Sequence, residues 1–415
     1  LVPGGPAQQG EELQPGDRIV AVAQGSEPPV DVVDERIDKV VKQIRGPKGT
    51  EVRLTVIPVD APDPSHTRVI HITRDQVILA ADDAESRVIE VPGQDGQGIK
   101  LGLIDIPSFY QDFQARRGGD PEYKSTTRDV KQLLTELKAE EVSGIILDVR
   151  RNGGGSLNEA VELTGLFIPQ GPVVQIGDRS GRTEAMYDPD PAVVYEGPLM
   201  VLTSPLSASA SEILAGAIQD YDRGLVVGSA STHGKGTVQN VIDLDPVLRR
   251  FVRYPTSDDL AGAVKVTTHK FYRVSGASTQ LRGVQADVVL PSPYDGLELL
   301  EGDLDYVLGW DRVAPLTYRE IDNLEPTAER LQALSAERVA NDPSFTELME
   351  AIAKRREADG IVSLALETRR KELESFPQPA SDDEEDQRND DIILDEATRI
   401  MGDWLTSKVT QAQPG

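Results

Sequence analysis

Two short segments contain the residues that could do covalent chemistry. Residues 207–212 read Ser-Ala-Ser-Ala-Ser-Glu, and residues 234–239 read Gly-Lys-Gly-Thr-Val-Gln. A serine needs a base to become a nucleophile, and a lysine can be that base if it is held neutral. The chain has no cysteine and only four histidines, so it offers few other routes to covalent catalysis. The two segments predict a serine peptidase that uses a Ser/Lys dyad.

The serine segment follows a predicted strand at 199–203 and precedes a predicted helix that begins near Ala210. A serine at such a turn is exposed and lies at the positive end of the helix dipole, which favours a developing oxyanion. The alternative is that Ser207, Ser209 and Ser211 are ordinary N-cap residues. Taken alone, this segment favours the capping role.

A glycine run at 152–155, Asn-Gly-Gly-Gly, follows a predicted buried strand at 144–149 and precedes a predicted helix at 158–167. Its backbone N–H groups can form an anion nest. A nest that faces a serine at a helix start has the geometry of an oxyanion hole. By itself the run would equally suit a phosphate site or a tight turn.

Lys235 lies between two glycines, shortly after a predicted apolar strand at 225–228. A free lysine has a pKa of about 10.4, so about one in a thousand is neutral near pH 7.5. Desolvation can lower this pKa by roughly three units, at a cost of about 4 kcal/mol. The alternative is a surface lysine in a flexible glycine turn. A phosphate-binding loop is excluded, because five residues instead of four separate Gly228 from Gly234 and Gly236 replaces the required Ser or Thr.

His233 suggests a Ser/His/Asp arrangement as a second possibility for the base. Such a histidine needs an acid to orient it, and the chain contains no Gly-x-Ser-x-Gly elbow. Lysine is the preferred base once the family resemblance described below is included.

The elements that must position these segments are strands and helices that alternate between residues 100 and 300. Strands are predicted at 103–107, 144–149, 199–203 and 225–228, and helices at 126–140, 158–167 and 210–221. This alternation predicts right-handed βαβ units around a largely parallel sheet. Ligands bind at the carboxyl ends of such strands, where the serine, lysine and glycine segments all lie.

Three regions are predicted along the chain: 1–59, 60–305 with a strand-rich connecting segment at 60–100, and 306–415. The first is a small β-rich module with one helix, in which Ile37, Val40, Val41 and Ile44 share a face. The connecting segment contains His66 and His71 without partners at ligand spacing, so no metal site is expected. The last region is helical, with amphipathic stretches at 328–339, 344–357 and 392–406 and an acidic solvated loop at 381–386.

Composition limits the class of protein further. The 415 residues are too many for one core. A net charge of −27 argues against nucleic acid or an anionic lipid surface as partner. No apolar run of about 18 residues occurs, so no integral membrane segment is expected. The absence of cysteine excludes thiol catalysis and suits an oxidising compartment. The chain opens at Leu1 without a signal segment, and we expect a fragment or processed product.

In this order, the segments resemble the C-terminal processing (tail-specific) peptidases, particularly their long periplasmic form. The likeness runs nearly end to end and includes residues 270–273 and 278–284, which are similar to the closing segment of that family's protease core. The resemblance implies an α/β core of the Clp-protease/crotonase type, a partial PDZ domain at 1–59 and a helical C-terminal region. The first strand and the carboxylate-binding loop of the PDZ domain would precede Leu1.

The resemblance also assigns roles to individual residues. It implies Ser209 as nucleophile, Lys235 as general base and Gln239 as the residue that orients the lysine. The remaining implied roles are oxyanion-hole donors at Gly155 and Ala210, supporting acids at Glu212 and Asp220, and a PDZ peptide groove at Ile37, Val41 and Ile44. His233 departs from the family, which has an aromatic residue there, and the loop before Gly234 is one residue longer.

The implied function is a serine endopeptidase that recognises apolar C-terminal tails of envelope proteins and cleaves inside the chain, without metal or other cofactor. The implied location is the periplasm of a Gram-negative cell, in association with the inner membrane. The implied partners are protein and peptide substrates with apolar C-termini and a lipoprotein adaptor built from helical repeats. The alternatives are a non-catalytic PDZ scaffold or adaptor and a crotonase-like acyl-transfer enzyme.

Overall fold

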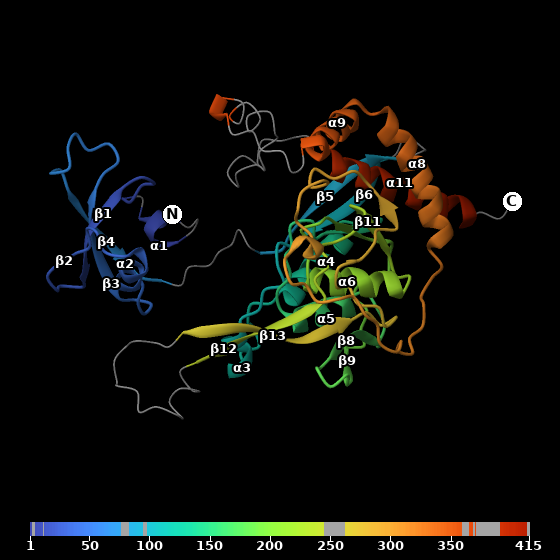
Figure 1. The fold of residues 1–415 in the computed structure, drawn as a ribbon, viewed down its shortest axis with the longest axis horizontal. Helices are drawn as coiled ribbons and strands as arrows, with labels where there is room; N and C mark the ends of the chain where they lie inside the picture. The colour runs from blue at the N-terminus through green and yellow to red at the C-terminus, as the bar shows by residue number, and fades with distance from the viewer. Residues whose placement is uncertain are drawn as a thin grey trace. The chain divides into compact units, whose positions relative to one another are not determined.

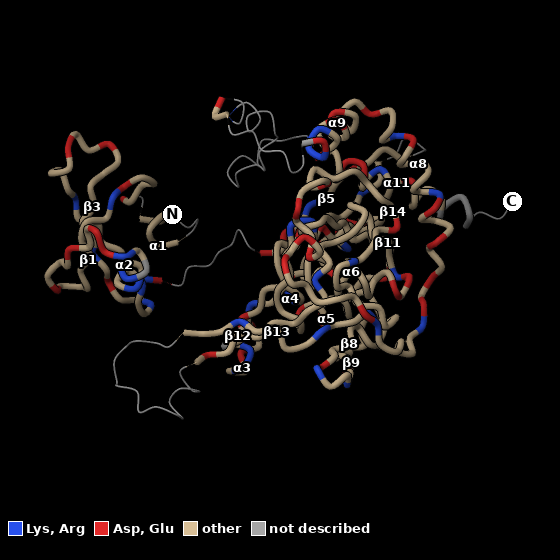
Figure 2. The backbone as a smooth tube through the Cα atoms, in the orientation of Figure 1, with Lys and Arg blue, Asp and Glu red and all other residues tan. Residues whose placement is uncertain are grey.

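The computed structural model describes residues 1, 5–10, 12–75, 83–93, 98–244, 262–358, 365–367, 370 and 391–412. The chain divides into two compact units, 1–83 and 84–415, which are drawn in Figure 1. The predicted acidic loop at 381–386 lies outside the described residues. Lys and Arg are interspersed with Asp and Glu along both units (Figure 2).

The first unit is a four-stranded antiparallel sheet with one principal helix. Its elements are α1 (Pro6–Gln9), β1 (Arg18–Gln24), β2 (Val30–Asp31), α2 (Ile37–Ile44), β3 (Glu51–Ile57) and β4 (Arg68–Thr73), and the strand order is β2-β1-β3-β4. The alternating sequence of β3 buries Val52, Leu54 and Val56 on one face, as a half-buried strand requires. Helix α2 packs on this core through Val40 and Ile44.

Strand β4 corrects the predicted boundary at residue 59. It pairs with β3 along its whole length, from Glu51 opposite Thr73 to Val56 opposite Arg68, and buries Ile70 in the same core. The segment that we expected to connect to the protease core therefore completes the sheet of the first unit, which extends to Asp83. Polar residues on the outer face of β4 hid this pairing in the sequence.

The second unit is built on a six-stranded sheet of order β14-β11-β10-β7-β6-β5. Its strands are β5 (Glu85–Pro92), β6 (Gly98–Asp105), β7 (Gly144–Asp148), β10 (Leu199–Thr203), β11 (Leu225–Gly228) and β14 (Val288–Val289). All neighbours pair in parallel except β5, which is antiparallel to β6. Strands β7 and β10 are buried along their entire length, because helices cover both faces of the sheet.

One face of this sheet packs on the helices predicted between its strands, and the other on the C-terminal helices. The first set is α4 (Thr126–Ala139), α5 (Leu157–Gly165) and α6 (Ala210–Asp220), and the second is α8 (Glu325–Asn341), α9 (Pro343–Ala358) and α11 (Ile392–Ala412). A short helix α3 (Phe113–Gly118) and a 3₁₀ turn η2 (Glu301–Asp303) complete the helices used below. Within the described ranges, no helix combines the length and apolar character needed to cross a bilayer.

A second, antiparallel sheet of order β12-β13-β8-β9 lies beside the first. Its strands are β8 (Pro172–Gly177), β9 (Thr183–Tyr187), β12 (Thr237–Asp243) and β13 (Ala263–Tyr272). Strands β12 and β13 project from the unit as a long ribbon (Figure 1). Strand β12 begins two residues after Lys235, and its register with β13 shifts between Val238 and Gln239.

Candidate active site

The three serines after β10 have different environments. Ser207 is fully buried, and its hydroxyl donates to the carbonyl of Val149 at 2.7 Å. Ser211 is also fully buried, and its hydroxyl donates to the carbonyl of Asn152 at 2.8 Å. Ser209 is partly exposed at the N-cap of α6, where it forms a capping box with Glu212, and its hydroxyl donates to no acceptor among the described residues. Of the three hydroxyls, that of Ser209 is the one available to react.

The backbone of Ser209 is held in an unusual conformation. It precedes α6 with φ 57° and ψ −107°, a combination that is sterically unfavourable for a residue with a side chain. Its N–H donates to Oε2 of Glu212 at 2.7 Å, one turn into the helix. Strained backbone of this kind persists only where neighbouring structure holds it, and it is concentrated at functional sites.

The predicted glycine run lies directly against Ser209. A Cβ on Gly154 would lie 2.9 Å from the Cβ of Ser209, so only glycine permits this approach. Gly154 and Gly155 have φ of 110° and 147°, which favour glycine. The N–H groups of Gly155 and Ala210 donate to no acceptor in the described part of the chain. They are therefore available to an oxyanion at Ser209.

Asn152 connects the glycine run to the serine segment by hydrogen bonds, a role that was not predicted from the sequence. Its side chain is fully buried and accepts from the N–H of Gly154 at 2.8 Å. Its backbone carbonyl accepts from the N–H of Ala208 at 3.1 Å. Its Nδ2 donates to the carbonyl of Ile106 at 2.8 Å.

The backbone of Gly234-Lys235-Gly236 is hydrogen-bonded at all six polar groups. The N–H groups of Gly234 and Lys235 donate to Oε1 and Oε2 of Glu212, at 2.7 and 3.0 Å. The N–H of Gly236 donates to Oε1 of the buried Gln280 at 2.8 Å. The three carbonyls accept from the N–H of Leu281 at 2.8 Å, the hydroxyl of Thr279 at 3.2 Å and the N–H of Phe271 at 3.0 Å. The lysine therefore lies on a fixed loop, which excludes a flexible turn.

Glu212 joins the serine and lysine segments. Its carboxylate is fully buried and accepts from the N–H groups of Ser209, Gly234 and Lys235. A fourth bond comes from the hydroxyl of Thr232 at 2.7 Å, which the sequence did not single out. Burial raises the pKa of Glu212 to about 7, and the four hydrogen bonds oppose this rise because they favour the ionised form.

The side chain of Lys235 is half-buried and carries a perturbed amine. Burial lowers the pKa of Lys235, the positive charge of Lys265 lowers it further, and the carboxylates of Glu301 and Glu212 oppose both effects. Nζ donates to Oε1 of Gln239 at 3.5 Å. The structure brings Lys235 and Gln239 together as expected, but no hydrogen bond joins Nζ to the hydroxyl of Ser209 among the described contacts.

Asp220 and His233 lie outside this arrangement. Asp220 is at the opposite end of α6 from Ser209, where it forms an ion pair of 2.6 Å with Arg273. The N–H of His233 donates to the carbonyl of Ser207 at 3.0 Å, while its buried Nδ1 has no hydrogen-bond partner. The nearest acid, Glu301, is 3.9 Å from Nδ1, so the imidazole lacks a hydrogen-bonded acid to orient it.

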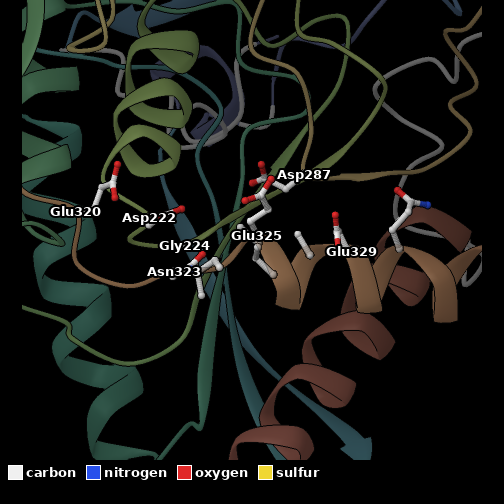
Figure 3. A pocket seen from close by; sticks show the side chains of 11 residues that line it. Asp222, Gly224, Asp287, Glu320, Asn323, Glu325 and Glu329 are labelled. Atoms are coloured by element: carbon white, nitrogen blue, oxygen red, sulfur yellow. The ribbon is translucent and has the colours of Figure 1, made fainter. Parts of the chain in front are cut away.

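A separate hollow of the second unit contains no predicted site residue. This cavity of about 700 Å³ lies between β11 and the start of α8 and is lined by acids, including Asp222, Asp287 and Glu329 (Figure 3). The described residues contain no group of three or more His, Asp or Glu side chains placed to hold a metal ion.

The predicted PDZ residues belong to the first unit. Ile37 is 80% exposed, Val41 is partly exposed, and Ile44 packs against the core. Ile37 therefore presents most of its apolar surface, and Val41 and Ile44 present part of theirs.

Three family models match this chain. They are peptidase family S41 over residues 100–290, the C-terminal domain of tail-specific protease over 294–388, and the PDZ domain over 1–57. The PDZ match ends at residue 57, and the S41 match begins at residue 100.

Individual proteins are similar over much of the chain. The tail-specific protease of Haemophilus influenzae is 38% identical over 360 residues, which are 86% of this chain and 48% of that protein. The chloroplastic carboxyl-terminal-processing peptidase 2 of Arabidopsis thaliana is 32% identical, over 58% of this chain and 42% of that protein. The crystal structure of a Vibrio cholerae carboxy-terminal protease PDZ domain in complex with peptide is 47% identical, with a TM-score of 0.17, and covers 18% of this chain and 74% of that one. The chain spans about half the length of the curated relatives it matches.

Proposed function

We propose that this chain, which belongs to peptidase family S41, is a serine endopeptidase in which Ser209 is the nucleophile and Lys235 the general base. The observation that carries this proposal is the carboxylate of Glu212, which accepts from the backbone of both residues at 2.7 and 3.0 Å. These two bonds fix the serine and lysine segments to one another. The first segment carries a hydroxyl without an acceptor among the described residues, and the second carries a lysine with a lowered pKa.

The first step forms the acyl-enzyme. Neutral Lys235 accepts the proton of the Ser209 hydroxyl as Oγ attacks the carbonyl carbon of the substrate peptide bond. The negative charge moves to the carbonyl oxygen, where the N–H groups of Gly155 and Ala210 stabilise it. The intermediate collapses, the C–N bond breaks, and the ammonium of Lys235 gives its proton to the leaving amine.

The second step hydrolyses the acyl-enzyme. Lys235, neutral again, accepts a proton from water as the water oxygen attacks the ester carbonyl. The tetrahedral intermediate expels Oγ of Ser209, which recovers its proton from the lysine. Gln239 holds Nζ in place through its Oε1, the contact of 3.5 Å described above.

Substrate selection is assigned to the first unit. A PDZ domain binds an extended C-terminal peptide as an added strand beside its helix, with alternate side chains in pockets. The exposed Ile37 and the partly exposed Val41 on α2 give this groove an apolar wall, with Ile44 at its base. Proteins with apolar C-terminal tails are therefore the proposed substrates, in the periplasm, with a helical-repeat lipoprotein as adaptor.

Cleavage of an unfolded reporter with an apolar C-terminal tail tests the proposal. Ser209→Ala and Lys235→Ala should both abolish cleavage, and His233→Ala should retain it. Cleavage that survives Lys235→Ala and is lost in His233→Ala would assign the base to histidine. Tail binding without cleavage by the unmodified chain would support the alternative of a non-catalytic PDZ scaffold.

A further inference from the structure

A short turn, within the residues matched by the C-terminal domain model, packs against residues 233–236, which we call the lysine loop. This turn, η2, begins at Glu301, whose N–H donates to the carbonyl of His233 at 2.9 Å. It lies beyond the residues matched by the S41 model and within those matched by the C-terminal domain model. The part of the chain matched by the C-terminal domain model thus directly contacts the segment that contains the proposed base.

The side chain of Glu301 makes a second connection to the same loop. Its Oε1 accepts from Nε2 of Gln280 at 3.0 Å, and Oε1 of Gln280 accepts from the N–H of Gly236 at 2.8 Å. The loop is therefore held by Glu301 on both sides of Lys235, directly at His233 and through Gln280 at Gly236. The carboxylate is 14% exposed, so solvent screens its charge only weakly.

We propose that Glu301 is a positioning residue for Lys235: it fixes the lysine loop through His233 and Gln280 and contributes a weakly exposed carboxylate to the charges around it. This inference rests on the proposed function, in which Lys235 must be neutral to accept a proton.

Several charged groups face this part of the site. Lys265 from β13, Glu212 from α6 and Glu301 from η2 act on Lys235, and Glu301, Lys235 and Asp303 act on His233. A negative charge near an ammonium stabilises it and raises its pKa. Removal of the Glu301 charge should therefore lower the pKa of Lys235 and leave more neutral lysine at a given pH.

The test uses Glu301→Gln, which keeps an oxygen for Gln280 and leaves the backbone bond to His233 in place. Glu298→Gln is the matched control, because this exposed acid lies three residues away and does not act on Lys235. In the pH profile of kcat/KM, the acidic limb should shift to lower pH in Glu301→Gln and stay in place in Glu298→Gln. An unshifted limb in Glu301→Gln would overturn the inference.

A second measurement does not require activity. Trace labelling with acetic anhydride across pH, read by mass spectrometry on the Lys235 peptide, follows the neutral amine directly. Labelling at a given pH below the lysine pKa should be faster in Glu301→Gln than in the unmodified chain. Equal labelling curves would reject the role of Glu301, whereas retained cleavage in Lys235→Ala would reject the proposed base alone.

His233 also faces Glu301, so the carboxylate could act on Lys235 through the imidazole. This indirect effect must be separated from direct action on the lysine. The labelling comparison is repeated in a His233→Gln background, where the imidazole can no longer respond to the carboxylate. A shift that persists there supports direct action on Lys235, and one that disappears overturns it.

Discussion

Ser209 and Lys235 donate their backbone N–H groups to the same oxygen, Oε2 of Glu212, at 2.7 and 3.0 Å. Their main chains are therefore fixed relative to one another before any substrate binds. In general, preorganised groups avoid reorganisation at the moment of reaction, which is a large part of enzymatic rate enhancement.

Substitution of the serines should separate chemistry from stability. Ser209→Ala should abolish cleavage with little change in melting temperature, because its hydroxyl donates to no acceptor among the described residues. Ser207→Ala should retain cleavage by the folded fraction but destabilise the chain by about 1–3 kcal/mol, because the N–H of Ser204 would lose its buried acceptor. Reporter cleavage and thermal unfolding of both variants check this. The reverse pattern would reassign the nucleophile.

Neighbouring glycines should respond differently to alanine. In Gly154→Ala the new Cβ would lie 2.9 Å from the Cβ of Ser209 at φ 110°, so we expect loss of cleavage and a lower melting temperature. Gly153→Ala is the control, because a Cβ there meets nothing within 4 Å and the N–H is retained. Equal activity of the two variants would contradict the close contact between the glycine run and Ser209.

Glu212→Gln should weaken the connection between the two segments. The amide nitrogen cannot accept hydrogen bonds, so two of the four donors lose their acceptor, at about 1–3 kcal/mol each. Cleavage should fall together with the free energy of unfolding. Chemical denaturation at pH 8 measures the second effect.

The pH dependence of stability gives an independent test of Glu212. Its pKa is about 7 when folded, against an ordinary value of 4.5, so the folded chain holds this proton more tightly. This tighter proton binding adds about 3 kcal/mol to the free energy of unfolding. The added stability is fully present below pH 4.5 and is lost as pH rises through 7. Denaturation from pH 4.5 to 8 should show this decline in the unmodified chain and lack it in Glu212→Gln.

Gln239→Glu should make the lysine harder to deprotonate. It places a negative charge at the position that is 3.5 Å from Nζ, which raises the pKa of Lys235. The acidic limb of the kcat/KM profile should move to higher pH. Asn240→Asp is the control, since successive residues of a strand point to opposite faces. A limb that moves equally in both variants would argue against a specific contact at Gln239.

The first unit offers a test of tail recognition. Ile37→Asp should weaken binding of an apolar C-terminal peptide without loss of stability, because the side chain is 80% exposed. Val69→Asp, at a position 50% exposed on β4, should leave peptide binding unchanged. Fluorescence titration with a labelled peptide compares the two. Unchanged affinity in Ile37→Asp would remove this residue from the groove.

Local sequence patterns were sufficient to predict several central elements of the second unit, but not the strands of its antiparallel sheet. The helix predicted at 126–140 is observed at Thr126–Ala139, because Ser125 caps its first turn by accepting from the N–H of Arg128. The strand predicted at 199–203 is identical to β10. Where the spacing of apolar residues and the capping residues indicate the same helix or strand, its bounds can be predicted from the local sequence.

Contacts between distant segments could not be predicted in this way. Glu301 follows Lys235 by more than sixty residues, and no local pattern marks their proximity. Asp220 was expected to be a supporting acid of the site, and it lies eleven residues of α-helix, or about 16 Å, from Ser209. Spacing along a helix gives the face of a residue, but not which end of the helix lies at the site.

Helix α6 is anchored at both ends, by Glu212 at its start and by the ion pair of Asp220 with Arg273 at its finish. Helix ends are ordinarily the first parts of a protein to fray. Here fraying at the start would release the strained backbone of Ser209. Double anchoring should make the helix one cooperative unit, so the hydrogen-bonded amides near its ends, such as those of Glu212 and Tyr221, should exchange with solvent as slowly as those in its middle. The backbone of Ser209 would then lose its geometry only when the unit as a whole unfolds.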